Sequence, residues 1–259
     1  MDLKLRGKTA LITGGSRGIG LAVARALTDE GCAVRLVGRS QENLEQAKTS
    51  LGTLGGTVSV HIADLTDPEA LKSLDAANAD LDILINNAGA IPRGTLTELG
   101  ESDWRAAWDL KLFGYINLTR LIYTRMKERR KGVIINIIGV GGERPSAAYL
   151  AGGSANAALM AFTSALGGES VDYGIRVVGV NPGLVATDRM VTLLEKDAQV
   201  QLGDPVRWRE LLESRPFGRA AEPEEIASVV AFMASDKASY VSGTIVTVDG
   251  GSTTRQLPL

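Results

Sequence analysis

Thr13-Gly14-Gly15-Ser16-Arg17-Gly18-Ile19-Gly20 is the stretch that decides the fold of this chain. It lies between a short apolar run, Thr9–Thr13, and a segment of helical periodicity, Ile19–Glu30. Glycines at positions 14, 18 and 20 permit a tight turn, a close approach of the backbone to a pyrophosphate, and close packing of the helix on the strand. The first N–H groups of the helix are then free to bind phosphate oxygens. The stretch predicts a nucleotide-binding turn at the start of an α/β fold.

Short β-branched and aliphatic runs alternate with helical segments along the rest of the chain. Because these runs are apolar on both faces, they are typical of parallel strands covered by helices on both sides. We expect strands at Thr9–Thr13, Ala33–Val37, Val58–Ile62, Ile83–Asn86, Val133–Ile138, Ile175–Val180 and Thr244–Val248. The pattern predicts a Rossmann-like, doubly wound parallel sheet of seven strands with helices on both faces, in one domain over residues 1–259.

Three local features refine this prediction. Ser40 is expected to cap the helix that follows it, and Asp67 with Pro68 to open another. Residues 187–215 interrupt the alternation and contain several arginines and Trp208. We expect them to form a helical flap that binds substrate within the single domain.

Composition excludes several classes of function. The 28 Lys+Arg against 30 Asp+Glu, without long runs of one sign, argue against binding to nucleic acid or to a membrane surface. A single cysteine, Cys32, cannot form an internal disulfide. A single histidine, His61, excludes a Ser-His-Asp hydrolase and a multi-histidine site, so no metal is expected.

Two segments bear on location. The N-terminal residues MDLKLRGKTALITGG have no long apolar core and no small-residue cleavage site, so no signal peptide is expected. The charge-free stretch Pro145–Gly168 is long enough to cross a bilayer, but its Ala, Gly, Ser and Asn content favours a buried helix packed through small residues. We therefore expect a cytoplasmic protein.

The second strand carries a signal for cofactor choice. An NAD-preferring site usually has an acidic residue at the end of this strand to bind the ribose 2′-hydroxyl. Here the strand ends at Gly38 and is followed by Arg39, while Arg17 lies in the glycine turn. Two guanidinium groups can bind a 2′-phosphate, so NADP(H) is favoured over NAD(H). The alternative is that both arginines are solvated surface residues.

Further motifs occur in order along the chain. They are Asp64-Leu65, Asn86-Asn87-Ala88-Gly89, Pro182-Gly183 with Thr187, Glu222-Pro223-Glu224-Glu225-Ile226, and Val248-Asp249-Gly250-Gly251. With the glycine turn, this ordered set resembles the short-chain dehydrogenase/reductase family over essentially the whole chain. The resemblance implies an oxidoreductase that acts on a carbonyl/alcohol pair.

The same resemblance implies the cofactor contacts. Asp64 and Leu65 would contact the adenine, Asn87 to Gly89 the adenosine ribose, and Val185 with Thr187 the nicotinamide carboxamide. The full expected cofactor site is Gly14, Ser16, Arg17, Gly18, Ile19, Gly20, Arg39, Asp64, Leu65, Asn87, Ala88, Gly89, Pro182, Gly183, Val185 and Thr187.

The catalytic pattern of the family is altered. Relatives carry an Asn, a Ser, a Tyr and a Lys that move a proton to the alkoxide formed by hydride addition. Alignment through Val133–Ile138 and Ala157-Ala158-Leu159 puts Lys111, Gly139, Gly152 and Asn156 at these positions. The four residues on which this proton transfer normally depends have therefore all changed.

Three explanations remain open. In the first, Tyr149 and Lys111 supply the acid and its cation, and Asn156 holds the nicotinamide ribose. In the second, the cofactor binds without redox turnover and the protein is regulatory, structural or redox-neutral. In the third, Gly139 and Gly152 clear space for a bulky substrate and water donates the proton. Because loss of a positioned acid costs about 10²–10⁴ in rate, oxidoreductase activity is favoured.

Simpler roles exist for both candidate residues. Tyr149 can be a packing residue at a helix start, and Lys111 a snorkelling lysine or one that pairs with Asp109 or Asp103. Four arginines, Arg93, Arg144, Arg189 and Arg207, are expected near the substrate mouth, where they would bind a carboxylate or phosphate. The alternative for them is ordinary loop charge.

Two helical segments bear on assembly. Glu101–Arg130 and Pro145–Gly168 correspond to the helices through which relatives usually dimerise. The second is rich in alanine, including Ala151, Ala155 and Ala158, which permits close helix approach. The resemblance therefore implies a symmetric homotetramer, or a homodimer.

Overall fold

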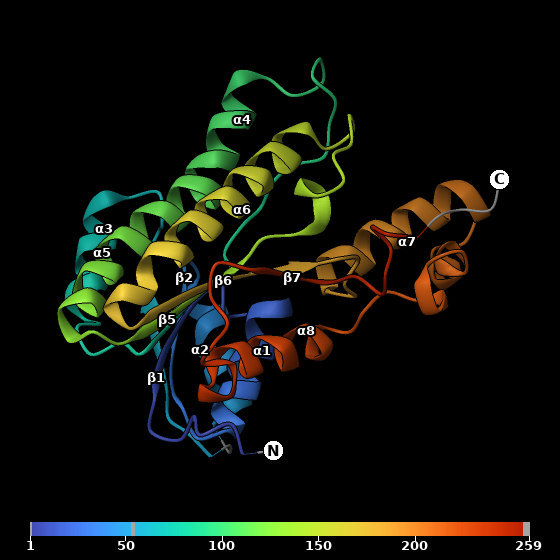
Figure 1. The fold of residues 1–259 in the computed structure, drawn as a ribbon. Helices are drawn as coiled ribbons and strands as arrows, with labels where there is room; N and C mark the ends of the chain where they lie inside the picture. The colour runs from blue at the N-terminus through green and yellow to red at the C-terminus, as the bar shows by residue number, and fades with distance from the viewer. Residues whose placement is uncertain (1, 53–54, 256–259) are drawn as a thin grey trace.

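A computed structural model describes residues 2–52 and 55–255 of the chain. It contains one parallel sheet with strand order β3-β2-β1-β4-β5-β6-β7. The strands are β1 Thr9–Thr13, β2 Ala33–Gly38, β3 Val58–Ile62, β4 Ile83–Asn86, β5 Gly132–Ile137, β6 Ile175–Pro182 and β7 Ile245–Val248. The predicted Rossmann-like, seven-stranded, single-domain fold is confirmed (Figure 1).

Four strands have bounds that differ from the prediction, and the first of them, β2, ends at Gly38 instead of Val37. β5 begins and ends one residue earlier than Val133–Ile138, and β7 begins at Ile245. β6 continues through Pro182 because the ladder with β7 pairs Gly179–Pro182 with Ile245–Val248. A proline at the last position of a strand costs the ladder little.

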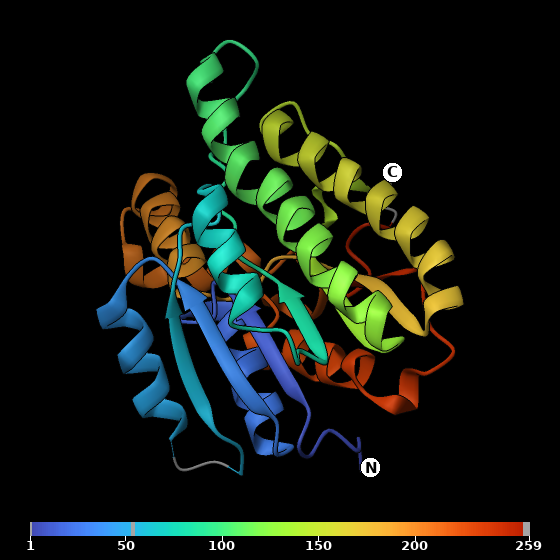
Figure 2. The ribbon, with the colours of Figure 1, turned by 90° about the vertical axis from the view of Figure 1, so that its left-hand side faces the viewer.

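Helices cover both faces of the sheet (Figures 1 and 2). One face carries α1 Gly18–Asp29, α2 Gln41–Leu51 and α8 Pro223–Ala234, and the other carries α3 Pro68–Ala76, α4 Glu101–Trp108, α5 Gly114–Arg129 and α6 Leu150–Ser170. Two predicted caps are confirmed, since the Ser40 hydroxyl accepts from the N–H of Asn43 and the Asp67 carboxylate from that of Glu69. Each cap satisfies an N–H at a helix start.

The two long helical segments differ from the prediction. Glu101–Arg130 is interrupted by a π-helical turn, η1 Asp109–Phe113, between α4 and α5. Pro145–Gly168 begins its helix only at Leu150, and α6 buries one face while Ala158 and other small residues on the opposite face are exposed. The helix that was predicted to be buried is therefore buried on one face only. No helix within the described ranges is long and apolar enough to span a membrane.

Residues 187–215 form helical structure beyond the sheet. α7 Asp188–Leu202 is followed by the 3₁₀ segment η4 Pro205–Leu212, and both lie at the right of Figure 1. Trp208 of η4 is buried against Leu194 and Ala198 of α7 in a separate apolar cluster. This cluster holds α7 and η4 together as one unit.

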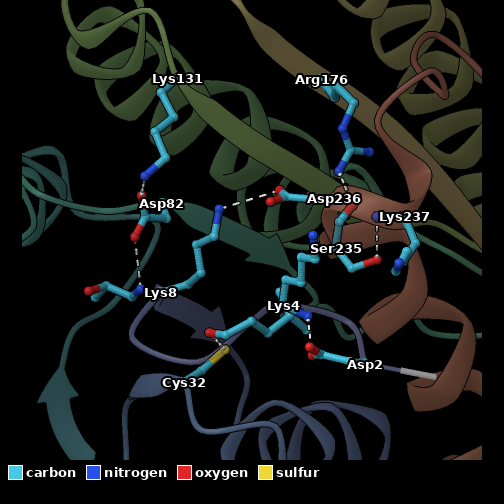
Figure 3. A network of polar contacts seen from close by, with 12 residues as sticks. Asp2, Lys4, Lys8, Cys32, Asp82, Lys131, Arg176, Ser235, Asp236 and Lys237 are labelled. Carbon is cyan, nitrogen blue, oxygen red and sulfur yellow. Dashed lines mark hydrogen bonds and ion pairs between the residues drawn. The ribbon is translucent and has the colours of Figure 1, made fainter.

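At the end of the sheet where the parallel strands begin, charged residues form local pairs (Figure 3). Asp82 accepts from the N–H of Thr9 and lies 2.7 Å from Nζ of Lys131. Lys8 pairs with Asp236 at 3.4 Å. These pairs join the residues that precede β1, β4 and β5 to one another and to Asp236 after α8.

Candidate active site

A cavity of about 930 Å³ opens at the carboxyl ends of β4 to β7. Its wall includes Gly89 after β4, Gly139 after β5, Gly183 after β6 and Asp249 after β7. Residues of α7 and the segment Arg215–Ala221 close its other side. In open α/β sheets, ligands bind at this end of the strands, so the cavity is the candidate active site.

The glycine turn has the close packing that its sequence predicts. A Cβ on Gly20 would lie 2.3 Å from the carbonyl oxygen of Gly14 and 2.5 Å from Nδ2 of Asn87. Gly14 and Gly18 have φ of +64° and +54°, a backbone region that favours glycine. A Cβ on Gly18 would lie 3.1 Å from Cγ2 of Thr187, so the turn contacts the start of α7.

The end of β4 is tied to this turn by hydrogen bonds. The Thr13 hydroxyl accepts from the N–H groups of Asn87 and Ala88, and Nδ2 of Asn87 donates to the carbonyls of Thr13 and Gly14. The Asn87 side chain therefore braces the turn. Thr13 was missed by sequence reasoning, although its position as the last residue of β1 is a usable signal.

The remaining expected cofactor residues have different exposures. Arg17 and Arg39 are exposed, whereas Leu65 and Val185 are buried. The Asp64 carboxylate accepts from the N–H and hydroxyl of Thr66, which lowers the pKa of Asp64, with a smaller contribution from Arg39. Of the sixteen expected residues, the cavity wall includes Gly89, Pro182, Gly183 and Thr187.

Tyr149 lies directly over Gly152. It is the residue before α6, and its side chain lines the cavity. A Cβ on Gly152 would lie 1.9 Å from Cζ of Tyr149, far inside van der Waals contact. A Cβ on Gly141 would lie 3.2 Å from Cδ1 of the same ring. The phenol therefore occupies the space that a side chain at position 152 would need.

Asn156 presents a buried amide to the same cavity. Its Nδ2 donates to the carbonyl of Gly139 at 3.2 Å, which fixes the orientation of the amide because the reversed form would place two oxygens together. Within the described part of the chain, no donor reaches its Oδ1. Asn156 is only 3% exposed, so this acceptor is an unsatisfied polar atom on the cavity wall.

Lys111 lies on the inner side of the π-helical turn η1. Its Nζ donates to the carbonyls of Ile137 at 2.8 Å and Ile138 at 3.1 Å and to the Tyr115 hydroxyl at 3.3 Å. Burial lowers the pKa of Lys111 to about 8. The expected alternatives of a snorkelling lysine or a pair with Asp103 or Asp109 are wrong, because the ammonium is held by oxygens at the end of β5.

The four expected arginines separate into two groups. Arg93 and Arg189 line the cavity. Arg144 donates to the carbonyl of Ser252, a residue of the cavity wall, and so lies at the cavity margin. Arg207 pairs with Glu210 at 2.6 Å on the surface and does not line the cavity, so the expectation was wrong for Arg207. Their local partners determine where these side chains point.

Two further arginines were missed. Arg215, the last residue of the predicted flap, and Arg219 line the cavity because the segment Arg215–Ala221 runs along it. Arg219 pairs with Glu225 at 2.6 Å, and this ion pair together with the N–H of Glu222 lowers the pKa of Glu225 to about 2. No pattern in residues 215–221 pointed to this course of the chain.

Burial raises the pKa of Tyr149, while the nearby guanidinium groups of Arg189 and Arg93 act in the opposite direction. The phenol is thus protonated at neutral pH. A protonated phenol, a buried amide acceptor and a buried ammonium on one cavity wall can bind a polar ligand and deliver a proton to it.

A doubly wound parallel sheet whose glycine-rich turn opens α1, with a polar cavity at the strand ends, defines a dinucleotide-binding α/β protein. A family model described as short chain dehydrogenase matches residues 8–198. The chain belongs to the short-chain dehydrogenase family of oxidoreductases.

Two curated relatives share about a third of their residues with it. The chain is 35% identical to the 3-oxoacyl-[acyl-carrier-protein] reductase FabG of Chlamydia pneumoniae, over 98% of this chain and 100% of that one. It is 33% identical to the FabG of Thermotoga maritima, over 96% and 99%.

Solved structures show the same fold. L-sorbose reductase from Gluconobacter frateurii, complexed with NADPH and L-sorbose, has a TM-score of 0.92 and 32% identity, covering 99% of this chain and 100% of that one. NAD⁺-bound xylitol dehydrogenase has a TM-score of 0.87 and 27% identity, covering 96% and 100%.

Proposed function

We propose that this protein is an NADP(H)-dependent oxidoreductase that interconverts a carbonyl and an alcohol, with the phenol of Tyr149 as the proton donor. The observation that carries the proposal is the place of this phenol, which fills the space above Gly152 on the wall of the cavity. A side chain at position 152 and the side chain of Tyr149, which precedes α6, would therefore place a hydroxyl in the same region of the cavity. Tyr149 would therefore take the role of the tyrosine that relatives carry at the position of Gly152.

The proposed cofactor is NADP(H), with NAD(H) as the weaker ligand. When bound, it supplies or accepts the hydride. Arg17 and Arg39 are exposed beside the turn and have the charge to bind a 2′-phosphate. The unsatisfied Oδ1 of Asn156 would accept from a hydroxyl of the nicotinamide ribose. Relatives bound to NADPH and to NAD⁺ support this choice.

Lys111 would supply positive charge at the cavity floor. All three N–H bonds of a protonated lysine have acceptors here, in the carbonyls of Ile137 and Ile138 and the hydroxyl of Tyr115. The ammonium therefore fixes the end of β5, next to Gly139, and adds a positive charge to the site. Direct contact with the reacting oxygen is not required for this role.

The flap and the assembly complete the proposal. Residues 187–215 would cover the bound substrate, and Arg93 with Arg189 would favour an anionic one. The exposed small residues of α6 permit close contact with a second copy, which favours a homotetramer or homodimer. The single thiol, Cys32, is buried, which fits a cytoplasmic protein.

The proposal is tested in two stages. Fluorescence titration with NADPH and with NADH should show tighter binding of NADPH. NADPH oxidation is then measured with L-sorbose and with a 3-oxoacyl thioester, the substrate types of the two relatives. Tyr149→Phe should lose activity, while Tyr240→Phe, a control at a fully exposed tyrosine, should keep it. Tight NADPH binding without turnover on any carbonyl would instead favour a cofactor-binding protein without redox activity.

A further inference from the structure

Three polar side chains from separate segments face the same cavity. They are Tyr149 before α6, Arg93 in the loop after β4, and Arg189 in the first turn of α7. All three line the same cavity. Lys111 also lines it, but its ammonium is directed to oxygens at the end of β5.

Backbone contacts hold these segments together. The N–H of Gly94, next to Arg93, donates to the carbonyl of Ala148 at 2.9 Å, and Gly94 forms an isolated parallel bridge with Tyr149. Nη2 of Arg189 donates to the carbonyl of Ile91 in the same loop at 3.5 Å. The loop after β4 therefore links α7 to the residue that carries the phenol.

The two guanidinium groups are free to act on the phenol. Within residues 2–52 and 55–255, no ion pair involves Arg93 or Arg189. Two carboxylates also lie on the cavity wall, Glu225 and Asp249. Glu225 is paired with Arg219, and Asp249 accepts from N–H groups of its own turn. The negative charges facing the cavity are therefore already compensated.

We propose that Arg189, assisted by Arg93, stabilises the phenolate that Tyr149 becomes when it gives up its proton. This inference rests on the proposed function. In the reductive direction, the carbonyl oxygen would take the proton of the Tyr149 hydroxyl as that O–H bond breaks, and a bound reduced nicotinamide would supply the hydride that the carbonyl carbon accepts. The products are the alcohol, the oxidised cofactor and the phenolate, which regains a proton from water. Arg189 acts through Tyr149 and is a positioning residue.

The physical need for such a cation is clear. Burial disfavours the phenolate, and two nearby positive charges oppose this effect, with Arg189 contributing more than Arg93. Lys111 is not among the charges that act on the phenol, and its ammonium is held by Ile137, Ile138 and Tyr115. Since Arg189 lies on α7, the acidity of the phenol depends on the position of this helix.

The test measures the phenol itself and needs no substrate. The absorbance change at tyrosine ionisation is titrated in the free protein, and the titration of Tyr149→Phe is subtracted to isolate Tyr149. We expect Arg189→Gln to raise the pKa of Tyr149 by roughly half a pH unit or more. Arg189→Lys should restore most of the difference, because it retains the charge. Arg207→Gln, which removes a paired surface arginine of the same segment, should change nothing.

The outcomes separate the two claims. An unchanged Tyr149 titration in Arg189→Gln, with a normal circular dichroism spectrum and NADPH affinity, would overturn the role of Arg189. If Arg189 only binds substrate, Arg189→Gln would leave the Tyr149 titration unchanged and would raise the KM for the substrate instead. If Tyr149→Phe also retains full turnover, the proposed proton donor itself is wrong. If Tyr149→Phe is inactive while Arg189→Gln leaves the titration unchanged, only the inference about Arg189 fails.

Discussion

Gly152→Ala is the substitution that tests the relocated phenol most sharply. The added Cβ would lie 1.9 Å from Cζ of Tyr149 and 2.2 Å from Cε1, so the ring must leave its position. The ring is the far end of a rotatable side chain, and it can move without displacing the helix. We therefore expect activity to fall by about 10²–10⁴, the usual cost of losing a positioned acid.

The expected change in stability is small. Alanine in place of glycine within a helix stabilises by about 1 kcal/mol, and overpacking costs about 1–3 kcal/mol. The net loss is thus roughly 0–2 kcal/mol. In a Tyr149→Ala background the clash is gone, so adding Gly152→Ala should stabilise by about 1 kcal/mol. Gly152→Ala changes the free energy of unfolding by different amounts in wild type and in Tyr149→Ala, and this difference measures the contact between the Tyr149 ring and the backbone at position 152.

A matched control lies on the same helix. Gly168 of α6 is exposed, and a Cβ there would meet nothing within 4 Å. Gly168→Ala should stabilise by about 1 kcal/mol and keep full activity. The assays are urea unfolding and NADPH oxidation with a carbonyl substrate. If Gly152→Ala is as active and as stabilised as Gly168→Ala, the phenol does not act from the position above Gly152.

Three further predictions follow from individual side chains. Arg39→Asp should weaken NADPH binding by more than tenfold and leave NADH binding nearly unchanged, as measured by fluorescence titration; equal losses for both would contradict a 2′-phosphate site. The pKa of Lys111 falls from 10.5 to about 8 on folding, so the folded state loses this proton first. Wild type should therefore gain about 3 kcal/mol of stability relative to Lys111→Met between pH 8 and 10.5, as measured by urea unfolding; a constant difference would show that the ammonium is not destabilised by burial. Because the pKa of Glu225 falls from 4.5 to about 2, its pairing stabilises above pH 4.5 and is lost as pH falls towards 2. The Tm difference between wild type and Arg219→Gln should shrink over this range, and a difference independent of pH would exclude the ion pair as its source.

The fold could be predicted from the sequence because each strand is a short apolar run bounded by turn residues. The glycine turn could also be predicted. Position 20 requires glycine because the backbone of Gly14 and the side chain of Asn87 leave no room for a Cβ, and both belong to motifs visible in the sequence. The π-helical turn at Asp109–Phe113 was not readable. Lys111 in this turn contacts Tyr115 of α5 and the carbonyls of Ile137 and Ile138 at the end of β5, and such tertiary contacts leave no local pattern in the sequence.

The site was predicted in part. One of the three explanations drawn from the sequence assigns roles to the phenol of Tyr149 and the amide of Asn156, and both residues line the cavity. Which arginines reach the cavity could not be predicted, because this depends on local ion pairs such as that of Arg207 with Glu210 and on the course of the chain after residue 215.

The most direct test of the account is a single-turnover measurement of NADPH oxidation by wild type and Tyr149→Phe, with NADPH affinity measured in parallel. We predict that the variant binds NADPH with unchanged affinity and transfers hydride about 10²–10⁴ times more slowly. Equal single-turnover rates for the two proteins would contradict the proposal that the phenol above Gly152 donates the proton.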